Sequence, residues 1–292
     1  FPAQIPVILA GGDQSTAAVG MGVINPGSVG TNTGTGSFIM TPVDKPIFDR
    51  KLRISCSASA IPNRWNIEAS VLTTGRLYHW LALEIGSGNF SRTQIDDENI
   101  LKKELKALDE LASQSITGSH GVVAIPHFAG AATPFWNQHA RGIFLNLDLS
   151  TTRADIIRSV LESIAVELGM GFEILKENVG NLKVMIIAGG MTKAKIFNQI
   201  QADSFGIPVR KNHRTEATSF GAFITALVYS GIHKDHSEAY KVLTIDDVSE
   251  WEYPNMENVR ILDTIKHFRS QFDRVLVENE IYSALRELRY AE

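Results

Sequence analysis

The chain contains a single cysteine, Cys56, which excludes an internal disulfide framework and a zinc site built from cysteines. It also lacks an apolar run long enough to span a bilayer, and it has no basic-then-apolar leader. The 28 basic residues are scattered and fewer than the 32 acidic ones, so the formal net charge is -4. This balance argues against nucleic acid or a membrane as partner. We therefore expect a cytoplasmic protein.

What is present is typical of a soluble globular protein. Hydrophobic residues make up 44% of the 292 positions and charged residues 21%, which allows a sizeable core. This length fits one large domain or two ordinary ones. The most linker-like stretch is residues 86–96, and nothing in the sequence forces a division there.

Hydrophobic periodicity predicts an α/β fold in which helices pack on a mixed sheet. The expected strands are residues 7–10, 36–40, 53–57, 122–125 and 184–187, with a further one around Val209. The expected helices are residues 74–83, 101–111, 152–177, a turn or more around 196–200, residues 216–229, and a last helix from 258 onward. Thr152 and Asp155 resemble a capping pair at the start of the longest helix.

Asp13 and Gln14 form the first candidate site, because they follow an expected strand and the turn-forming Gly11-Gly12. A carboxylate at the end of a strand in an open α/β sheet stands where such folds bind ligands, and it can take a proton from a hydroxyl. Gln14 could orient the same hydroxyl. The alternative is that Asp13 only caps a helix or turn.

Gly34-Thr35-Gly36 is the second candidate site. Its backbone amides and the Thr35 hydroxyl could hold the outer phosphates of a nucleotide. The alternative is an ordinary glycine-rich hairpin turn. The segment has no Walker lysine, so a P-loop enzyme is not expected.

Gly189-Gly190 is the third candidate site, since it lies between an apolar strand and a helix start. Glycines there let the backbone approach a nucleotide, and the helix dipole favours its phosphates. The same order also opens a dinucleotide-binding unit. The full Gly-x-Gly-x-x-Gly pattern and its acidic partner are missing, which weighs against a nicotinamide enzyme. No group of residues is assigned to a metal.

Three blocks of the sequence, in this order, resemble the C-terminal half of the FGGY carbohydrate kinases. The blocks are Gly11–Gln14 with Asn32–Gly36, then Pro134–Asn137 with Ala140–Gly142, and finally Ala188–Gly190 with Gln201–Asp203, Gly206–Val209 and Glu216–Ala222. Each block is a weak signal by itself, but together they cover most of the chain.

The resemblance implies an actin/hexokinase-type ATPase fold, in which two ribonuclease-H-like lobes face each other across a cleft. Residues 1–292 would be the C-terminal, ATP-binding lobe, cut from a longer protein whose N-terminal sugar-binding lobe is absent here. We therefore expect a mixed sheet with helices on both faces, and no catalysis by this fragment alone. A homo-oligomer remains possible.

The resemblance also implies residue roles. Asp13 would be the base on the acceptor hydroxyl, Gln14 a polyol contact, and Thr35 a contact to the terminal phosphates. Gly75 and Gly190 would lie against ATP, and His79 stands where glycerol kinases have Gln. Ala194 replaces an Asn of glycerol kinases, so a pentulose such as xylulose, or gluconate, is expected as acceptor, with glycerol as the alternative.

The sequence therefore predicts the nucleotide-binding half of a carbohydrate kinase that uses ATP and Mg²⁺ to phosphorylate a sugar or polyol. One rival is a nucleotide-binding module of the same fold without kinase activity. A second rival is the nicotinamide oxidoreductase.

Overall fold

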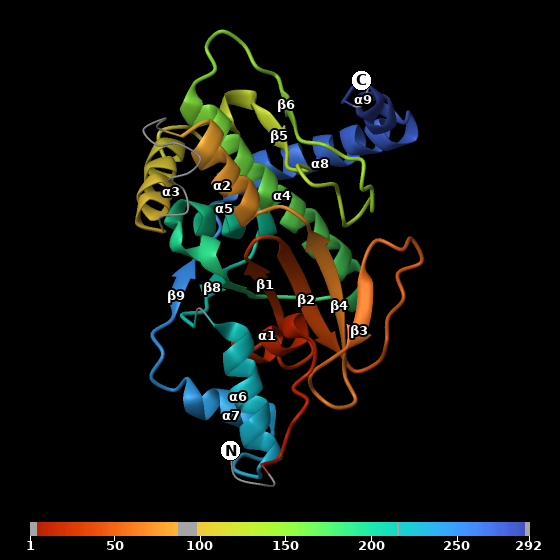
Figure 1. Ribbon diagram of the computed structural model, residues 1–292, viewed down its shortest axis with the longest axis vertical. Helices are drawn as coiled ribbons and strands as arrows, with labels where there is room; N and C mark the ends of the chain where they lie inside the picture. The colour runs from red at the N-terminus through yellow and green to blue at the C-terminus, as the bar shows by residue number, and fades with distance from the viewer. Residues whose placement is uncertain (1–4, 87–97, 215, 290–292) are drawn as a thin grey trace.

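The computed structural model describes residues 5–86, 98–214 and 216–289. The linker-like stretch of residues 86–96 lies outside these ranges, except for Gly86. The largest feature is a seven-stranded sheet with strand order β3-β4-β2-β1-β7-β8-β9, and a two-stranded sheet pairs β5 with β6 (Figure 1). The strands are β1 (Val29–Thr33), β2 (Ser37–Val43), β3 (Ser55–Ala58), β4 (Trp65–Val71), β5 (Val123–Ile125), β6 (Ile143–Leu145), β7 (Met185–Ala188), β8 (Val209–Lys211) and β9 (Glu250–Glu252).

The α-helices lie between these strands and after them. They are α1 (Asp13–Met21), α2 (Gly75–Glu84), α3 (Glu98–Ala112), α4 (Arg153–Val179), α5 (Lys195–Phe205), α6 (Ala217–Tyr229), α7 (His236–Leu243), α8 (Met256–Glu278) and α9 (Ile281–Arg289). Short 3₁₀ turns occur at η2 (Ser119–Gly121) and η3 (Gly190–Lys193). No helix in the described ranges combines the length and apolarity needed to cross a membrane.

The central sheet is mixed, because β1, β7 and β8 run parallel whereas β2, β3, β4 and β9 pair antiparallel with their neighbours. Successive strand residues point to opposite faces. Ile187 belongs to the large core cluster built with α4 and α5, whereas Ile186 belongs to a second cluster with α1 and Ala217 of α6. The predicted mixed sheet with helices on both faces is therefore confirmed.

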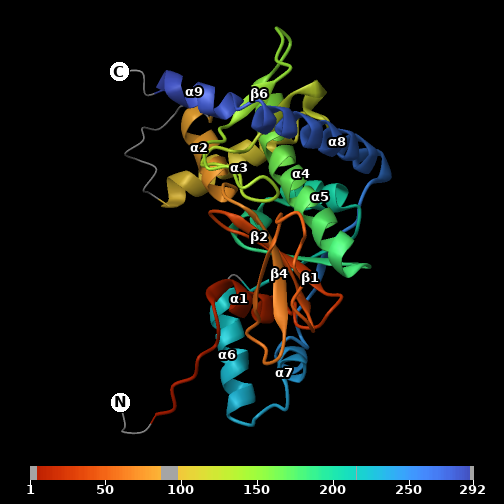
Figure 2. The same cartoon turned by 90° about the vertical axis from the view of Figure 1, so that its right-hand side faces the viewer.

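Helices α1 and α6 cross at two glycines, Gly20 and Gly221. A Cβ on Gly221 would overlap the carbonyl oxygen of Thr16, and one on Gly20 would overlap that of Ala217. The two helix backbones thus approach more closely than any larger side chain allows. Figure 2 shows the pair side by side beneath the sheet.

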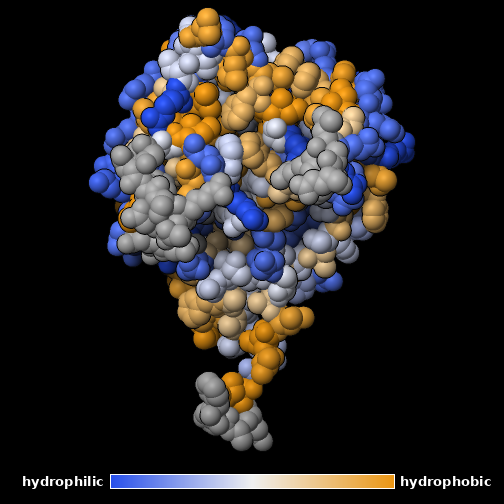
Figure 3. Space-filling model, turned by 45° about the horizontal axis from the view of Figure 1, so that its top comes forward, coloured by the Kyte–Doolittle hydropathy of each residue, from blue (hydrophilic) through white to orange (hydrophobic). Residues whose placement is uncertain are grey.

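The expected strand at residues 7–10 is wrong. These residues precede α1 without joining either sheet, and the side chains of Val7 and Leu9 are 95% and 91% exposed. A short apolar run forms a strand only when a neighbour accepts its backbone hydrogen bonds, and no described strand pairs with this segment. It projects from the body of the molecule with hydrophobic side chains outward (Figure 3).

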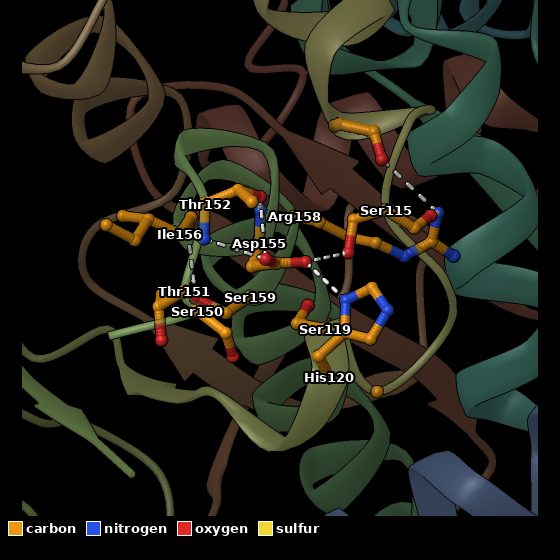
Figure 4. Close-up of polar contacts among 12 residues, drawn as sticks. Ser115, Ser119, His120, Ser150, Thr151, Thr152, Asp155, Ile156, Arg158 and Ser159 are labelled. Atoms are coloured by element: carbon orange, nitrogen blue, oxygen red, sulfur yellow. Dashed lines mark hydrogen bonds and ion pairs between the residues drawn. The ribbon is translucent and has the colours of Figure 1, made fainter. Parts of the chain in front are cut away.

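The longest helix, α4, begins with the predicted capping box. Thr152 and Asp155 satisfy each other's backbone amides, and Asp155 also accepts hydrogen bonds from Ser115 at 2.5 Å and from His120 Nδ1 at 2.7 Å (Figure 4). Burial raises the pKa of Asp155, but these hydrogen bonds outweigh burial and hold it well below its usual range. The same carboxylate thereby secures the loop before β5 to the start of α4.

The C-terminal helices are held by buried charges. Arg269 of α8, which is fully buried, bonds Glu167 of α4 at 2.8 Å and Asp273 at 3.0 Å. His127 Nε2 lies 2.9 Å from Glu167, and its Nδ1 lies 3.3 Å from the Tyr282 hydroxyl of α9. Burial raises the pKa of Glu167, but His127 and Arg269 outweigh this and lower it to about 2.

We predict that Gly221→Ala destabilises the fold, although Ala favours helices more than Gly does. The methyl group would force α1 and α6 apart, a cost of about 1–3 kcal/mol. Urea denaturation measures the loss. Ser219→Ala, an exposed change on the same helix, serves as control and should leave stability within about 0.5 kcal/mol. Equal stability of the two variants would contradict the close crossing.

Candidate functional site

A pocket of about 700 Å³ lies where the β1–β2 turn, the first turns of α2, helix α3 and the η3 turn converge. It gathers five of the predicted nucleotide residues, which come from three separate segments: Gly34, Thr35, Gly75, His79 and Gly190. Its other lining residues are Thr33, Arg76, Tyr78, Leu101, Lys102, Leu105, Lys106, Asp109, Met191, Lys193 and Ala194.

The Gly34-Thr35-Gly36 segment connects β1 to β2 as a hairpin turn, since Thr33 pairs with Ser37 across it. Its backbone therefore has the form of the glycine-rich hairpin that the sequence analysis gave as the alternative to a phosphate-binding turn. The turn is fastened to the start of α2, because the amide of Gly75 donates to Gly34 O at 2.9 Å and that of Thr74 to Thr35 O at 3.0 Å. These amides at the start of α2 are therefore already bound to protein. The Thr35 side chain stays exposed and faces the pocket.

Gly75 and Gly189 each pack closely against the backbone of this hairpin. A Cβ on Gly75 would overlap the Gly34 carbonyl oxygen, and one on Gly189 would stand 2.7 Å from the backbone nitrogen of Thr33. Gly189 also has a φ of +95°, a conformation that side chains other than glycine rarely adopt. Both positions need glycine for contact between backbones.

Gly190 differs from its neighbour Gly189. No atom lies within 4 Å of the place where its Cβ would stand, and the residue lines the pocket, whereas Gly189 does not. Gly36 also lies outside the lining, since its Cβ position is occupied by the backbone of Val71 and Leu72. The predicted glycines thus fall into two groups. Gly34 and Gly190 line the pocket with no close neighbour at their Cβ positions, whereas Gly36, Gly75 and Gly189 touch backbone there.

Most of the charged side chains in the pocket wall are cationic. Among the described residues, Arg76, Lys102, Lys106 and Lys193 line it with one carboxylate, Asp109. This balance suits a polyanion. Burial lowers the pKa of His79, which favours a neutral imidazole with one donor and one acceptor.

Asp13 and Gln14 do not line this pocket. Asp13 is the first residue of α1, exposed, with Gly12 at the N-cap position. A carboxylate in the first turn stabilises the helix by interacting with the helix dipole. This role is close to the alternative given in the sequence analysis, in which Asp13 only caps a helix or turn. Gln14 is half-buried, and its Oε1 has no hydrogen-bond partner within the described ranges.

Glu68 on β4 is a neighbour of Asp13 that the sequence analysis missed. Burial raises its pKa, the Ser70 hydroxyl lowers it, and the charge of Asp13 raises it further. The signal was available, because polar Asn66, Glu68 and Ser70 alternate with apolar residues along β4.

The sheet register relates this acidic pair to the pocket. Ser37, at the end of the turn, pairs with Val71, and Met40 pairs with Glu68. Glu68 therefore lies three residue pairs from the turn, or about 10 Å along the sheet.

Residues 29–230 match the model of the FGGY family of carbohydrate kinases, C-terminal domain. A glycerol kinase of Pseudothermotoga lettingae is 31% identical over 84% of this chain and 47% of its own length. One from Alkaliphilus oremlandii is 30% identical over 96% of this chain and 53% of its own. The chain spans about half the length of the curated relatives it matches.

The solved structures agree on the fold. A ligand-bound xylulose kinase from Lactobacillus acidophilus has a TM-score of 0.78 at 19% identity. The match covers 90% of this chain and 50% of the xylulose kinase chain. Plasmodium falciparum glycerol kinase with ADP has a TM-score of 0.72 at 24% identity, covering 91% of this chain with 50% of its own. The predicted ribonuclease-H-like fold of the actin/hexokinase type is confirmed.

We predict that Glu68→Gln stabilises the chain at pH 7. The folded state raises the pKa of this carboxyl above its ordinary 4.5, so it favours the protonated form. The wild-type chain therefore loses stability as pH rises through the raised pKa. Thermal denaturation should show a higher Tm for the variant at pH 7 and a smaller difference at pH 4.

Glu278→Gln at the exposed end of α8 is the matched control and should show no such pH-dependent difference. A Glu68→Gln variant with the same Tm as wild type at both pH values would contradict the half-buried, repelled state of this carboxyl.

Proposed function

The chain belongs to the FGGY family of carbohydrate kinases, and on that premise we propose that it is the nucleotide-binding half of an enzyme that phosphorylates a sugar or polyol. In this proposal residues 1–292 form the C-terminal lobe. An N-terminal lobe, outside this chain, completes the cleft and supplies most contacts to the acceptor. The reaction moves the γ-phosphoryl group of ATP to an acceptor hydroxyl.

The observation that carries the proposal is the pocket itself. It unites Gly34, Thr35, Gly75, His79 and Gly190, and its size of about 700 Å³ is within the range of small-ligand sites. Its cationic wall supports a triphosphate, and the open space at Gly190 lets the backbone approach it closely.

Magnesium would neutralise charge on the phosphate oxygens when bound. In the described ranges, no group of three or more His, Cys, Asp or Glu side chains is arranged to hold a metal. The ion would therefore be carried mainly by phosphate oxygens and water, as is common for Mg²⁺.

Asp13 is the proposed base. Its exposed carboxylate, on the α1 side of the sheet near Glu68, can accept the proton of an acceptor hydroxyl that attacks the γ-phosphorus in line. Gln14, next to it, can orient that hydroxyl.

A pentulose such as xylulose, or gluconate, is the proposed acceptor, with glycerol as the alternative. The glycerol kinases among the relatives support glycerol. Ala194 in the pocket wall, where the resemblance places an Asn in glycerol kinases, supports a different member of the family. A panel of these acceptors, scored by ADP formation in a protein that joins this chain to its N-terminal lobe, distinguishes them.

The rival is a binding module that holds nucleotide without transferring phosphate. It predicts ATP binding but no acceptor-dependent ADP formation in the joined protein. The exposed carboxylate of Asp13 favours the kinase, because binding alone needs no base.

We predict that Asp13→Asn in the joined protein lowers kcat about 10²- to 10⁴-fold, because the amide cannot accept the proton. The Kd for ATP should stay within about twofold, since Asp13 lies outside the pocket. Steady-state kinetics and nucleotide titration measure both. An unchanged kcat at unchanged ATP affinity would remove Asp13 from the reaction.

We also predict that the chain by itself binds ATP and that Gly190→Val weakens this binding at least about tenfold. No described atom lies within 4 Å of the Cβ position of residue 190, so the valine side chain starts in open space above the η3 turn and Tm should change little. Calorimetric titration measures the affinity, and Ser219→Ala on α6 is the control. Absence of ATP binding by the folded chain would overturn the proposed function.

A further inference from the structure

Helix α3 contributes a stripe of three residues to the pocket. Leu101, Leu105 and Asp109 are spaced four apart, so they share one face of the helix, and all three line the pocket. Two aliphatic side chains followed by a carboxylate form a surface with an apolar part and one polar end. This pattern fits a flat heterocycle better than a phosphate group.

The Asp109 carboxylate is held by α2. The Tyr78 hydroxyl donates a hydrogen bond to Asp109 Oδ1, and it is the one hydrogen-bond partner of this carboxylate among the described residues. The Tyr78 side chain is only 4% exposed, so the bond fixes the carboxylate from the buried side. Oδ1 is thereby occupied, while Oδ2 is left to accept a further donor.

The protonation states agree with this geometry. Burial is the main reason that the pKa of Tyr78 lies above its usual range, so the phenol keeps its proton and acts as the donor. Burial also raises the pKa of Asp109, the Tyr78 hydroxyl lowers it, and Glu110 raises it. Desolvation strengthens any hydrogen bond that the remaining oxygen accepts.

Among the described residues that line the pocket, Asp109 is also the one carboxylate. The charged neighbours Arg76, Lys102, Lys106 and Lys193 have only donors. A base that offers an amino group needs an acceptor, and a charged acceptor makes the stronger hydrogen bond.

We propose that Asp109, oriented by Tyr78, selects adenine by accepting a hydrogen bond from its 6-amino group. This inference rests on the proposed function, since it assumes that the pocket binds a nucleotide. Guanine and hypoxanthine carry an oxygen at the same position, which would face the carboxylate and repel it. Guanine could instead pair both its N1–H and its 2-amino group with a carboxylate, but that requires two free oxygens.

The test is calorimetric titration of the chain of residues 1–292 with ATP, ITP and GTP. ITP differs from ATP at position 6 and has no 2-amino group, so it isolates the contact. We expect the wild-type chain to bind ATP about 10- to 100-fold more tightly than ITP, the effect of one charged hydrogen bond. Asp109→Asn should reduce this ratio to within about threefold, because its amide can donate to the 6-oxygen.

Tyr78→Phe is the second variant, because it leaves the carboxylate in place and frees Oδ1. We expect its affinity for GTP to rise relative to ATP, which a merely structural role of Tyr78 would not produce. Glu110→Gln is the matched control: Glu110 is an exposed neighbour on α3 that does not line the pocket, and its change should preserve the wild-type ratios.

The possible results distinguish failure of adenine selection by Asp109 from failure of the proposed function. A chain that binds ATP, ITP and GTP equally, with Asp109→Asn behaving like Glu110→Gln, overturns the selection by Asp109 and leaves the proposed function standing. A folded chain that binds none of the three nucleotides overturns both. A preference for ATP over ITP that is lost in Asp109→Asn and kept in Glu110→Gln supports the inference.

Discussion

The pocket depends on the contact of three backbone segments that only glycine permits. Gly75 at the start of α2 contacts the turn after β1, and Gly189 just after β7 contacts Thr33 at the end of β1. A methyl group at either glycine would overlap that backbone. Hydrogen bonds from Thr74 and Gly75 then fix the turn's carbonyls. The exposed Thr35 side chain is therefore presented by a rigid frame rather than by a loose loop.

Close packing also positions helices that lie outside the pocket. Gly20 and Gly221 bring α1 against α6, which places Asp13 at the sheet face next to Glu68. On the opposite face, buried charges join α4 to the C-terminal helices, where Arg269 lies between Glu167 and Asp273. Such groups are costly to bury alone, so each needs its partners in place, and this requirement favours one arrangement of the helices.

The sequence predicted the elements whose signals are local. The helix at α4 was predicted with its capping pair, Thr152 and Asp155, and the strands β2, β5 and β7 follow from short apolar runs. Residues 7–10 carried a similar apolar signal but form no strand, because pairing depends on a neighbour that no local pattern reveals. Glu68 was missed for the opposite reason, since its alternating strand was visible but its neighbour Asp13 is 55 positions away.

By itself, the sequence determined the class of fold, the family resemblance and the set of glycines and threonines from which a nucleotide site could be built. Motif spacing and periodicity are local properties of the chain, and they are sufficient for that. Only the tertiary structure decided which glycines face open space, as Gly190 does, and which touch backbone, as Gly75 and Gly189 do. It alone joined Tyr78 of α2 to Asp109 of α3, because contacts between separate helices follow from how they pack and not from their own residues.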